Sequence, residues 1–265
     1  MGFGRIEEGT KQENGMRYMG SKRRFAKRLV PILMEHVGKD TLFVDAFCGG
    51  CNVLSAMPCA NKVGIDINRY MTEFWREAIS EYIDGVPFTC MSSSYTEEEY
   101  RAVRDSYRNK DGRYKDSFIG FVGTAGSWGG GWFKGYPKFN PNRNEDHIME
   151  AYMSVVNQLS KWLYLSSTRI FNMSYDEFDY PEGSVIYCDP PYRGTQGYEK
   201  GVSFDYEKFW EWVRRMAKKG HHVYVSEYDA PSDFKCVWSA KKKDSLADYT
   251  GKKQDLKIEK LFVYG

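Results

Sequence analysis

The tetrapeptide Asp189-Pro190-Pro191-Tyr192 directly follows residues 184–188, an apolar run that is typical of a buried strand. Two prolines fix the backbone and lack N–H donors, so the strand ends there and carbonyl groups around Asp189 are left to accept hydrogen bonds. A carboxylate, backbone acceptors and an aromatic face suit a planar ring with an exocyclic amino group, such as adenine or cytosine. The tetrapeptide therefore predicts a nucleobase site. The alternative is a plain strand end, with Asp189 as the cap of the next turn.

A second candidate site lies between residues 45 and 66. The segment Asp45-Ala-Phe-Cys-Gly-Gly50 follows a short apolar run, and Asp66 ends the next one. In a doubly wound sheet, a glycine turn lets a cofactor approach the backbone, and an acid at the end of the next strand accepts hydrogen bonds from ribose. Cys51 and Val53 occupy positions where a dinucleotide fingerprint would continue, so a nucleoside without phosphates fits better. Asp66 has an alternative role as the cap of the following helix.

Cys48 and Cys51 form a CxxC pair at this turn, which is also where a thioredoxin-like redox pair lies. This is the main competing chemistry. Thioredoxin-like folds are usually much shorter, however, and a redox function leaves residues 189–192 without a role. The other cysteines stand singly along the chain, so no second ligand pair for zinc is present and we expect no metal site.

The elements that would position these residues follow an α/β order. Apolar periodicity predicts helices at 25–37, 71–84, 96–109, 144–165 and 206–219, and strands at 42–47, 62–67, 169–173, 184–188, 222–226 and 258–264. Thr96 and Glu99 have the spacing of a capping box for the third helix. This order predicts an α/β fold with a Rossmann-like, doubly wound, mostly parallel sheet.

The middle of the chain differs in composition. Between residues 120 and 138, glycines alternate with aromatic residues and lysines, among them Trp128, Trp132, Lys134 and Lys138. Such side chains suit bases and phosphates, although an ordinary mobile loop is the alternative. We therefore expect a sheet domain in two parts, 1–84 and 167–265, separated at 85–166 by an inserted, mainly helical segment.

Composition and charge narrow the class of protein. The chain has 265 residues and a formal net charge of +2, which hides a run of cations without acids at 17–28 and a lysine cluster at 241–243. Each cluster suits either phosphates or a solvated helix face. Six cysteines and no apolar leader in residues 1–10 indicate a reducing compartment, and no run is long enough to span a bilayer. We expect a cytoplasmic protein with no membrane partner.

Four segments, taken in order, resemble the Dam-like class of DNA adenine N6-methyltransferases. They are Tyr18-Met-Gly-Ser-Lys22, Asp45-Ala-Phe-Cys-Gly49, Asp66 and Asp189-Pro-Pro-Tyr192. The resemblance extends from about residue 17 to residue 264, although the insertion matches only in general character. It implies S-adenosylmethionine as the cofactor and double-stranded DNA as the substrate, with 1–84 and 167–265 as the catalytic domain and 85–166 as an inserted target-recognition domain. Three small residues, Ser21, Ala46 and Cys51, replace a Gly, a frequent Pro and a frequent Gly of the family, which bears on cofactor affinity more than on reaction type.

The resemblance also implies roles for individual residues. The cofactor would contact Tyr18, Lys22, Asp45, Phe47, Gly49, Asp66, Asp176 and Asp189. Catalysis would fall to Asp189, Pro190 and Tyr192. Hydrogen bonds from adenine N6–H to the Asp189 carboxylate and the Pro190 carbonyl would localise the nitrogen lone pair for direct in-line methyl transfer. Tyr192 would stack on a base flipped out of the duplex.

By composition, DNA would be contacted by Arg23, Arg24, Trp128, Trp132, Lys134 and Lys138. Several alternatives stay open. Cytosine N4 or an RNA adenine are other targets for the same chemistry, although an Asp where cytosine N4 enzymes commonly show Ser favours adenine. Two alternatives come from other functional classes. One is a nucleic-acid-binding module without catalysis, and the other is a thiol oxidoreductase that uses Cys48 and Cys51. A restriction endonuclease as a partner also stays open.

Overall fold

The structure is a computed structural model that describes residues 15–142, 144–192, 204–241 and 258–265. The opening ten residues and two of the lysines at 241–243 therefore lie outside the described residues. The α-helices are α1 (Ala26–Leu33), α2 (Arg69–Asp84), α3 (Glu97–Asn109), α4 (Asp116–Gly123), α5 (His147–Lys161) and α6 (Tyr206–Lys218). The strands are β1 (Phe43–Asp45), β2 (Lys62–Asp66), β3 (Arg169–Asn172), β4 (Val185–Cys188), β5 (His222–Glu227), β6 (Phe234–Lys241) and β7 (Ile258–Tyr264).

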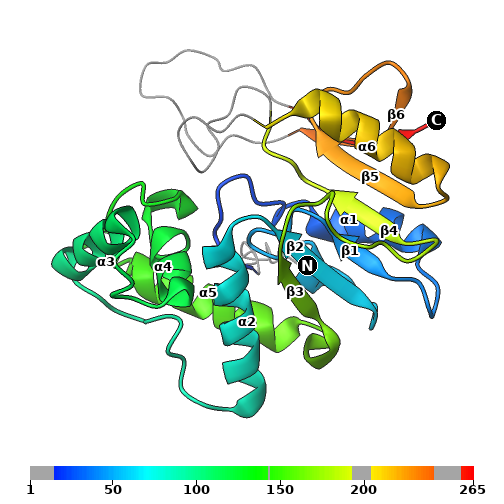
Figure 1. Ribbon diagram of the computed structural model, residues 1–265. Coiled ribbons are helices and arrows are strands. Elements are labelled where there is room, and N and C mark those ends of the chain that lie inside the picture. The colour runs from blue at the N-terminus through cyan, green and yellow to red at the C-terminus, as the bar shows by residue number, and fades with distance from the viewer. Residues whose placement is uncertain (1–14, 143, 193–203, 242–257) are drawn as a thin grey trace, which may run out of the picture.

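Within the described part of the chain these strands form a seven-stranded sheet in the order β3-β2-β1-β4-β5-β7-β6. The five strands from β3 to β5 are parallel, whereas β7 runs antiparallel to both β5 and β6. Parallel strands need crossover connections, which the helices supply (Figure 1). The predicted α/β, mostly parallel sheet is confirmed.

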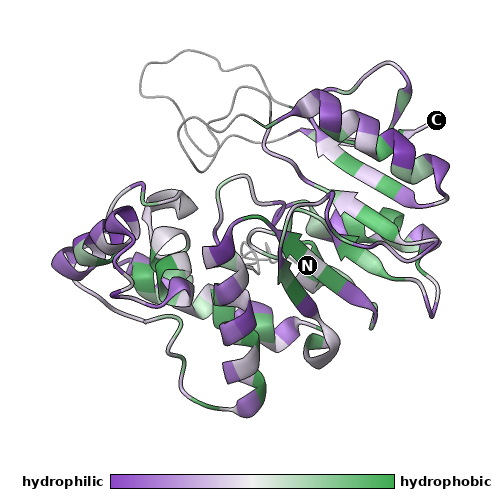
Figure 2. Ribbon diagram, in the orientation of Figure 1, coloured by the Kyte–Doolittle hydropathy of each residue, from purple (hydrophilic) through white to green (hydrophobic). Residues whose placement is uncertain are grey.

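The sheet is covered by helices on both faces. On one face α6 packs on β4 and β5 through Phe209, Trp212 and Val213. On the other face α1 packs on β1 and β4 through Leu29 and Leu33. The central strands are buried on both sides, and Figure 2 shows that they carry mostly hydrophobic residues, unlike the largely hydrophilic α3.

The helices α3, α4 and α5 of the 85–166 segment lie beside α2, away from α6 and β7 (Figure 1). Most of their buried apolar residues belong to one cluster that also contains residues of α1 and α2, so the segment packs directly on the sheet domain. Gly120 permits the closest contact, because a Cβ there would lie 2.2 Å from the Tyr70 carbonyl oxygen of α2.

Gln158 of α5 ties this segment to two distant parts of the chain. Its Oε1 accepts a hydrogen bond from the Met16 N–H at 2.6 Å. Its Nε2 donates to the carbonyl oxygens of Gly50 and Cys51, each at 3.1 Å. The side chain is buried, so these bonds are shielded from water.

Most expected elements are confirmed, with shifts at their ends. The helix expected at 25–37 ends at Leu33 and continues as a 3₁₀ turn at Met34–His36, and the one expected at 144–165 ends at Lys161. The Thr96–Glu99 capping box is present. Helix α4 and strand β6 were not expected from the sequence. Among the described residues, no helix is both long enough and apolar enough to cross a membrane.

Candidate active site

The sheet order brings the predicted acidic residues to one edge. Val44 of β1 lies between Val63 of β2 and Ile186 of β4, and all three strands run in the same direction. Asp45 and Asp66 end β1 and β2, and Asp189 directly follows β4. Their carboxyl groups therefore lie at the carboxyl ends of adjacent parallel strands, which is where ligands bind in open α/β sheets.

The glycine turn after β1 is closed by the first motif. Gly49 has a φ of +40°, and a Cβ there would lie 2.7 Å from the ring of Tyr18. The Gly49 N–H donates to Oδ2 of Asp66 at 2.8 Å, and its carbonyl accepts from Nε1 of Trp75 at 2.9 Å. Glycine is required here both by the backbone conformation and by the ring that covers it.

Asp66 belongs to the turn rather than to the helix that follows. Its Oδ1 accepts from the Asn68 N–H at 2.8 Å, and the side chain of Asn68, not of Asp66, caps α2 by accepting from Tyr70 N–H. The alternative role of Asp66 as the helix cap is therefore wrong. Burial raises the pKa of Asp66, against the opposing effect of the hydrogen bonds from Asn68 and Gly49.

Asp45 is buried with unused hydrogen-bonding capacity. Its side-chain Oδ1 has no hydrogen-bond partner among the described residues. Burial, and to a lesser degree the charge of Asp189, raise the pKa of Asp45 to about 8. A buried carboxyl with an unpaired oxygen is costly, so this position favours a ligand that brings hydrogen-bond donors or positive charge.

Asp189 is paired with Lys22 of the first motif. The Lys22 Nζ lies 2.6 Å from Oδ1 of Asp189, and the side chains are 3% and 18% exposed respectively. Burial raises the pKa of Asp189 to about 6, Lys22 lowers it, and Glu259 raises it further. The Lys22 side chain is almost fully buried, whereas the Asp189 carboxyl is partly exposed and accessible to a ligand.

Tyr192 packs on the same lysine. The Lys22 Nζ lies 4.6 Å from the centre of the Tyr192 ring, and the ring of Tyr228 contacts it edge-on at 4.5 Å. The Tyr192 hydroxyl donates to Oε1 of Glu259, a buried carboxylate on β7. The preceding proline, Pro191, accepts a hydrogen bond from the Tyr206 hydroxyl at 2.5 Å, which fixes the backbone of the tetrapeptide to the start of α6.

Two buried acids at this edge were missed from the sequence. Glu259 stands between Ile258 and Lys260 in a strand, and its partners Lys22 and Tyr192 are distant in the sequence, so no local pattern marked it as buried. Glu227 ends β5; its Oε2 has no partner among the described residues, and burial raises its pKa to about 7. Both lie near Asp189. The charge of Glu259 raises the pKa of Asp189, and the charge of Asp189 raises the pKa of Glu227.

Phe47 and Asp176 flank the turn on the α6 side. The Phe47 ring stacks on Tyr175 with ring centres 5.3 Å apart, which places the neighbouring Asp176 close to the turn. Asp176 is paired with Lys208 of α6, with an Oδ2–Nζ distance of 2.6 Å. Although partial burial raises the pKa of Asp176, hydrogen bonds from Lys208 and Ser174 lower it overall.

The run of cations at 17–28 does not form a single face. Lys22 is buried beside Asp189, and Arg17 forms an ion pair with Glu150 of α5 at 2.8 Å. Arg23 is partly buried and donates to the Gly15 carbonyl oxygen, whereas Arg24 is exposed. The predicted DNA contacts of Arg23 and Arg24 stay predictions, whereas Arg17 and Lys22 have structural contacts that the sequence did not reveal.

The predicted DNA-contacting residues of the 120–138 segment lie in different surroundings. Trp128 is 55% exposed, with one edge on His147. Lys134 and Lys138 are exposed, and Lys138 lies 3.7 Å from a Glu97 oxygen. Trp132 instead packs against the aromatic rings of Tyr70, Tyr107 and Phe133. The surroundings favour Trp128 over Trp132 as a side chain that meets a ligand.

The CxxC pair is unsuited to thiol redox chemistry in this conformation. Cys48 and Cys51 are buried and not joined by a disulfide. The hydrogen bond with Cys51 and burial raise the pKa of Cys48, and burial raises the pKa of Cys51, so neither is a ready thiolate. Cys51 also has a φ of 52°, a conformation that glycine adopts more readily, at the position where the Dam-like class frequently has Gly.

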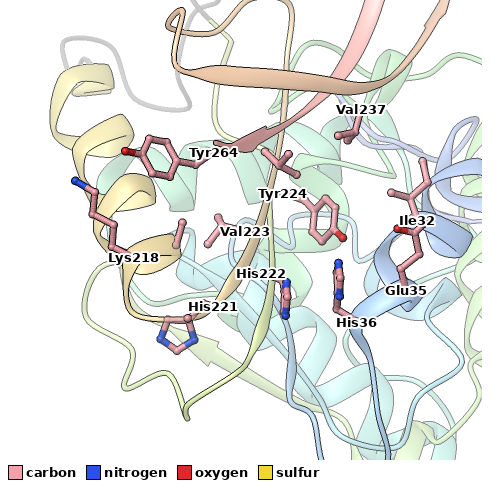
Figure 3. Close-up of a pocket in the computed structure, with 13 residues that line it drawn as sticks. Ile32, Glu35, His36, Lys218, His221, His222, Val223, Tyr224, Val237 and Tyr264 are labelled. Carbon is pink, nitrogen blue, oxygen red and sulfur yellow. The ribbon is translucent and has the colours of Figure 1, made fainter.

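A pocket of about 460 Å³ lies elsewhere (Figure 3). It is lined partly by the parallel rings of His36 and His222, whose centres are 3.8 Å apart. His222 opens β5 and pairs with Val185, which opens β4, so the pocket lies at the opposite end of the strands from Asp189. Among the residues that the structure describes, no group of His, Cys, Asp and Glu could hold a metal ion.

Comparison with known proteins gives a match over most of this site. The sequence model of a family described as D12 class N6 adenine-specific DNA methyltransferase matches residues 18–237. Type II methyltransferase M.FokI of Planomicrobium okeanokoites is 24% identical over 216 residues, which cover 73% of this chain and 32% of that protein. The chain thus spans about a third of the length of this relative.

Two bacterial proteins are among the solved structures that match this chain. HI0767 of Haemophilus influenzae is 8% identical, with a TM-score of 0.34 and coverage of 90% of this chain and 95% of its own. The Escherichia coli protein yhhF is 12% identical, also with a TM-score of 0.34, and the coverages are 94% and 88%. At these scores the fold assignment rests on the sheet order described above.

Proposed function

Because the chain belongs to the D12 class of N6 adenine-specific DNA methyltransferases, we propose that it transfers a methyl group from S-adenosylmethionine to N6 of adenine at a specific site in double-stranded DNA. The observation that carries this proposal is the Lys22–Asp189 pair. It joins the first motif to the tetrapeptide through a 2.6 Å contact and leaves the carboxyl of Asp189 partly exposed.

The residues at the carboxyl ends of the strands fit the cofactor. S-adenosylmethionine carries a positively charged sulfur and ammonium group and, when bound, supplies an electrophilic methyl group. Asp45, Asp66 and Asp189 place three carboxyl groups at the ends of adjacent strands, only that of Asp189 is paired with the Lys22 ammonium, and the Asp45 Oδ1 has no partner among the described residues. Such a surplus of buried negative charge is stabilised by a cationic ligand. The proposed cofactor site comprises Tyr18, Lys22, Asp45, Phe47, Gly49, Asp66, Asp176 and Asp189.

Asp189 is the proposed hydrogen-bond acceptor for the target amine. The lone pair of adenine N6 is delocalised into its ring, which makes the amine a poor nucleophile. Acceptors that hold both N6 hydrogens, the Asp189 carboxylate and the Pro190 carbonyl, would draw the lone pair back onto nitrogen and fix its direction. Lys22 supports this role, because its ammonium favours the ionised carboxylate.

The reaction also releases a proton from N6. Asp189 is the acceptor nearest to that hydrogen in the proposed arrangement, and its pKa of about 6 lets it take up a proton transiently and return it to water. No enzyme nucleophile is required. The thiols of Cys48, Cys51 and Cys188 all have pKa values raised by their surroundings, so a covalent intermediate on a thiolate of this site is disfavoured.

N6 of a paired adenine is inside the duplex, so the base must be flipped out at a cost of a few kcal/mol. We propose that Tyr192 stacks on the flipped base, that residues 85–166 form the target-recognition insertion, and that Trp128 supports the opened duplex. The exposed cations Arg24, Lys134 and Lys138, together with the partly buried Arg23, would contact phosphates. Trp132 would support DNA binding indirectly, because its packing in the aromatic cluster holds the glycine-rich segment in its conformation.

The partner and the cellular location of the protein are also proposals. The relative M.FokI is named a type II methyltransferase, which supports a role for this chain beside a restriction endonuclease. Because the chain spans about a third of that relative, a partner and the recognition sequence belong to the proposal. The free state of all six cysteines supports a reducing, cytoplasmic location.

The test is methyl transfer itself. The protein is incubated with radiolabelled S-adenosylmethionine and unmethylated DNA, and the modified bases are then mapped by sequencing. N6-methyladenine at one short sequence is the expected result. N4-methylcytosine, or label in RNA alone, would replace the proposed target, and no incorporation under conditions where the protein binds the cofactor would refute the enzymatic proposal.

A further inference from the structure

Glu259 is a buried acid on the antiparallel strand β7, beyond residues 18–237 that the family match covers. It is 1% exposed. Its backbone pairs with Ala240 of β6, and the next residue along β7, Lys260, pairs with Glu227 of β5. Strand β7 therefore carries Glu259 to the same edge of the sheet as the tetrapeptide.

Two side chains from other parts of the chain meet at Oε1 of Glu259. The Tyr192 hydroxyl donates a hydrogen bond to it, and the Lys22 Nζ lies 3.4 Å away. The same Nζ lies 2.6 Å from Oδ1 of Asp189 and 4.6 Å from the centre of the Tyr192 ring. One ammonium group is thus shared by two carboxylates, and one carboxylate holds both the ring and the ammonium that border Asp189.

We propose that Glu259 is a positioning residue of the methyl-transfer site. It fixes the Tyr192 ring and the Lys22 ammonium beside Asp189, and its charge controls how readily Asp189 loses its proton. The first part rests on the proposed function, because it concerns the reaction. The second part is a property of the protein alone and can be tested without substrate.

The direction of the electrostatic effect follows from the geometry. Burial raises the pKa of Asp189, Lys22 lowers it, and the charge of Glu259 raises it again. Without the charge of Glu259, the Lys22 ammonium interacts with the Asp189 carboxylate alone, and a negative charge near Asp189 is lost. Both changes stabilise the carboxylate form of Asp189. The other titratable groups that face this cluster are Glu227 at the end of β5, Tyr187 of β4 and Asp45 of β1.

The charge effect is measured by a carbon NMR titration of the full chain labelled at the aspartate carboxyl carbons. The Asp189 signal is assigned by its loss in Asp189→Asn. In Glu259→Gln, which keeps an oxygen acceptor but no charge, we expect the Asp189 midpoint to fall by about half a pH unit or more. In Glu211→Gln, which removes an exposed charge from α6, the midpoint stays at the parent value. An unchanged or higher midpoint in Glu259→Gln would overturn the proposal.

The positioning effect is measured with Glu259→Asp, which keeps the charge and shortens the side chain by one methylene group. We expect the Asp189 midpoint to stay near the parent value while the single-turnover rate of methyl transfer falls about tenfold, the loss of roughly one hydrogen bond. Tyr192→Phe should slow the same step, and the double variant should be no slower than the slower single variant, because both remove one interaction.

These readouts separate the two proposals. If the parent protein failed to methylate DNA, the proposed function would fall, whereas the titration midpoints would still decide the charge effect of Glu259. If Glu259→Gln lost the circular dichroism of the parent, Glu259→Asp and Tyr192→Phe would carry the test. A parent-like rate in Glu259→Asp, or strictly additive losses in the double variant, would contradict the positioning role.

Discussion

The ammonium of Lys22 contacts the carboxyl of Asp189 at 2.6 Å, although the two residues are 167 positions apart in the sequence. The first lies in the segment before α1, and the second follows β4. The contact makes the protonation state of the Asp189 carboxyl depend on how the segment before α1 is held, so the first motif and the tetrapeptide act as one unit.

Replacing Asp189 by Asn should lower the rate of methyl transfer by about 100-fold or more, the usual loss when a preorganised electrostatic contact to the reacting group is removed. The DNA dissociation constant should change little, because phosphate contacts supply most of the affinity. Incorporation of labelled methyl groups and a gel-shift titration measure the two effects. Asp40→Asn, an exposed change before β1, is the control. A parent-like rate in Asp189→Asn would remove Asp189 from the mechanism.

The rate should rise with pH through a midpoint near 6. Burial raises the pKa of Asp189 to about 6, and only its ionised form accepts both the N6 hydrogen and the proton that the reaction releases. Activity is therefore low at pH 5 and close to its plateau at pH 7.5. A profile of kcat/KM under constant ionic strength measures the midpoint. A flat profile from pH 5 to 7.5 would contradict this assignment.

Asp45→Asn should stabilise the protein without cofactor, by an amount that grows as pH rises from about 4 to 8 and is constant above that. Burial raises the pKa of Asp45 to about 8, above its value in the unfolded chain, so folding favours the protonated form. The stability that this group contributes is complete below pH 4 and is lost as pH rises through 8. Asn cannot ionise, so the Tm of the variant should exceed that of the parent by several degrees at pH 9, by less at pH 6, and match it below pH 4.

The same variant should bind S-adenosylmethionine more weakly, because it lacks the charge that the cofactor site is proposed to use. Calorimetric titration of the parent and of Asp45→Asn measures this loss. Equal affinities would show that Asp45 lies outside the cofactor site, whereas the alkaline gain in Tm is independent of that result.

Lys134→Ala should weaken DNA binding to specific and non-specific sequences alike. Loss of one phosphate contact lowers the slope of log K against log salt by about 0.9. Binding measured by fluorescence anisotropy at several salt concentrations gives this slope. Lys39→Ala, an exposed change between α1 and β1, should leave the slope unchanged. An unaltered slope in Lys134→Ala would place the DNA on another surface.

A thiol titration should find one fast-reacting cysteine in the native protein. Cys236 is exposed, and the other five cysteines are buried. Cys236→Ser should remove the fast reaction, and oxidant should not create a disulfide between Cys48 and Cys51. Formation of that disulfide under mild oxidation, with reversible loss of activity, would revive the redox alternative.

The sequence predicted the parallel part of the fold well, because buried strands in a parallel sheet are short apolar runs that end in polar residues. Asp45, Asp66 and Asp189 each marked such an end, and the sheet order then brought these ends together. The strand order itself was not predicted, since apolar runs of similar composition do not specify their neighbours.

The elements that were missed have identifiable causes. In α4, Gly120 and Gly123 lower the helix propensity, and the helix is stabilised by close packing on α2 that the sequence does not show. Strand β6 is an edge strand with a bulge between Cys236 and Trp238, and its exposed residues break the apolar pattern. Glu259 escaped notice because its partners, Lys22 and Tyr192, are distant in sequence.

Gln158 has a practical consequence for protein engineering. Its hydrogen bonds run from α5 to the backbone of Gly50 and Cys51. A chimera that exchanges residues 85–166 for those of a relative would therefore also replace the side chain that braces the glycine turn after β1. Donor segments that supply Gln at this position, or grafts that stop before α5, should retain catalytic competence while reading a new DNA sequence.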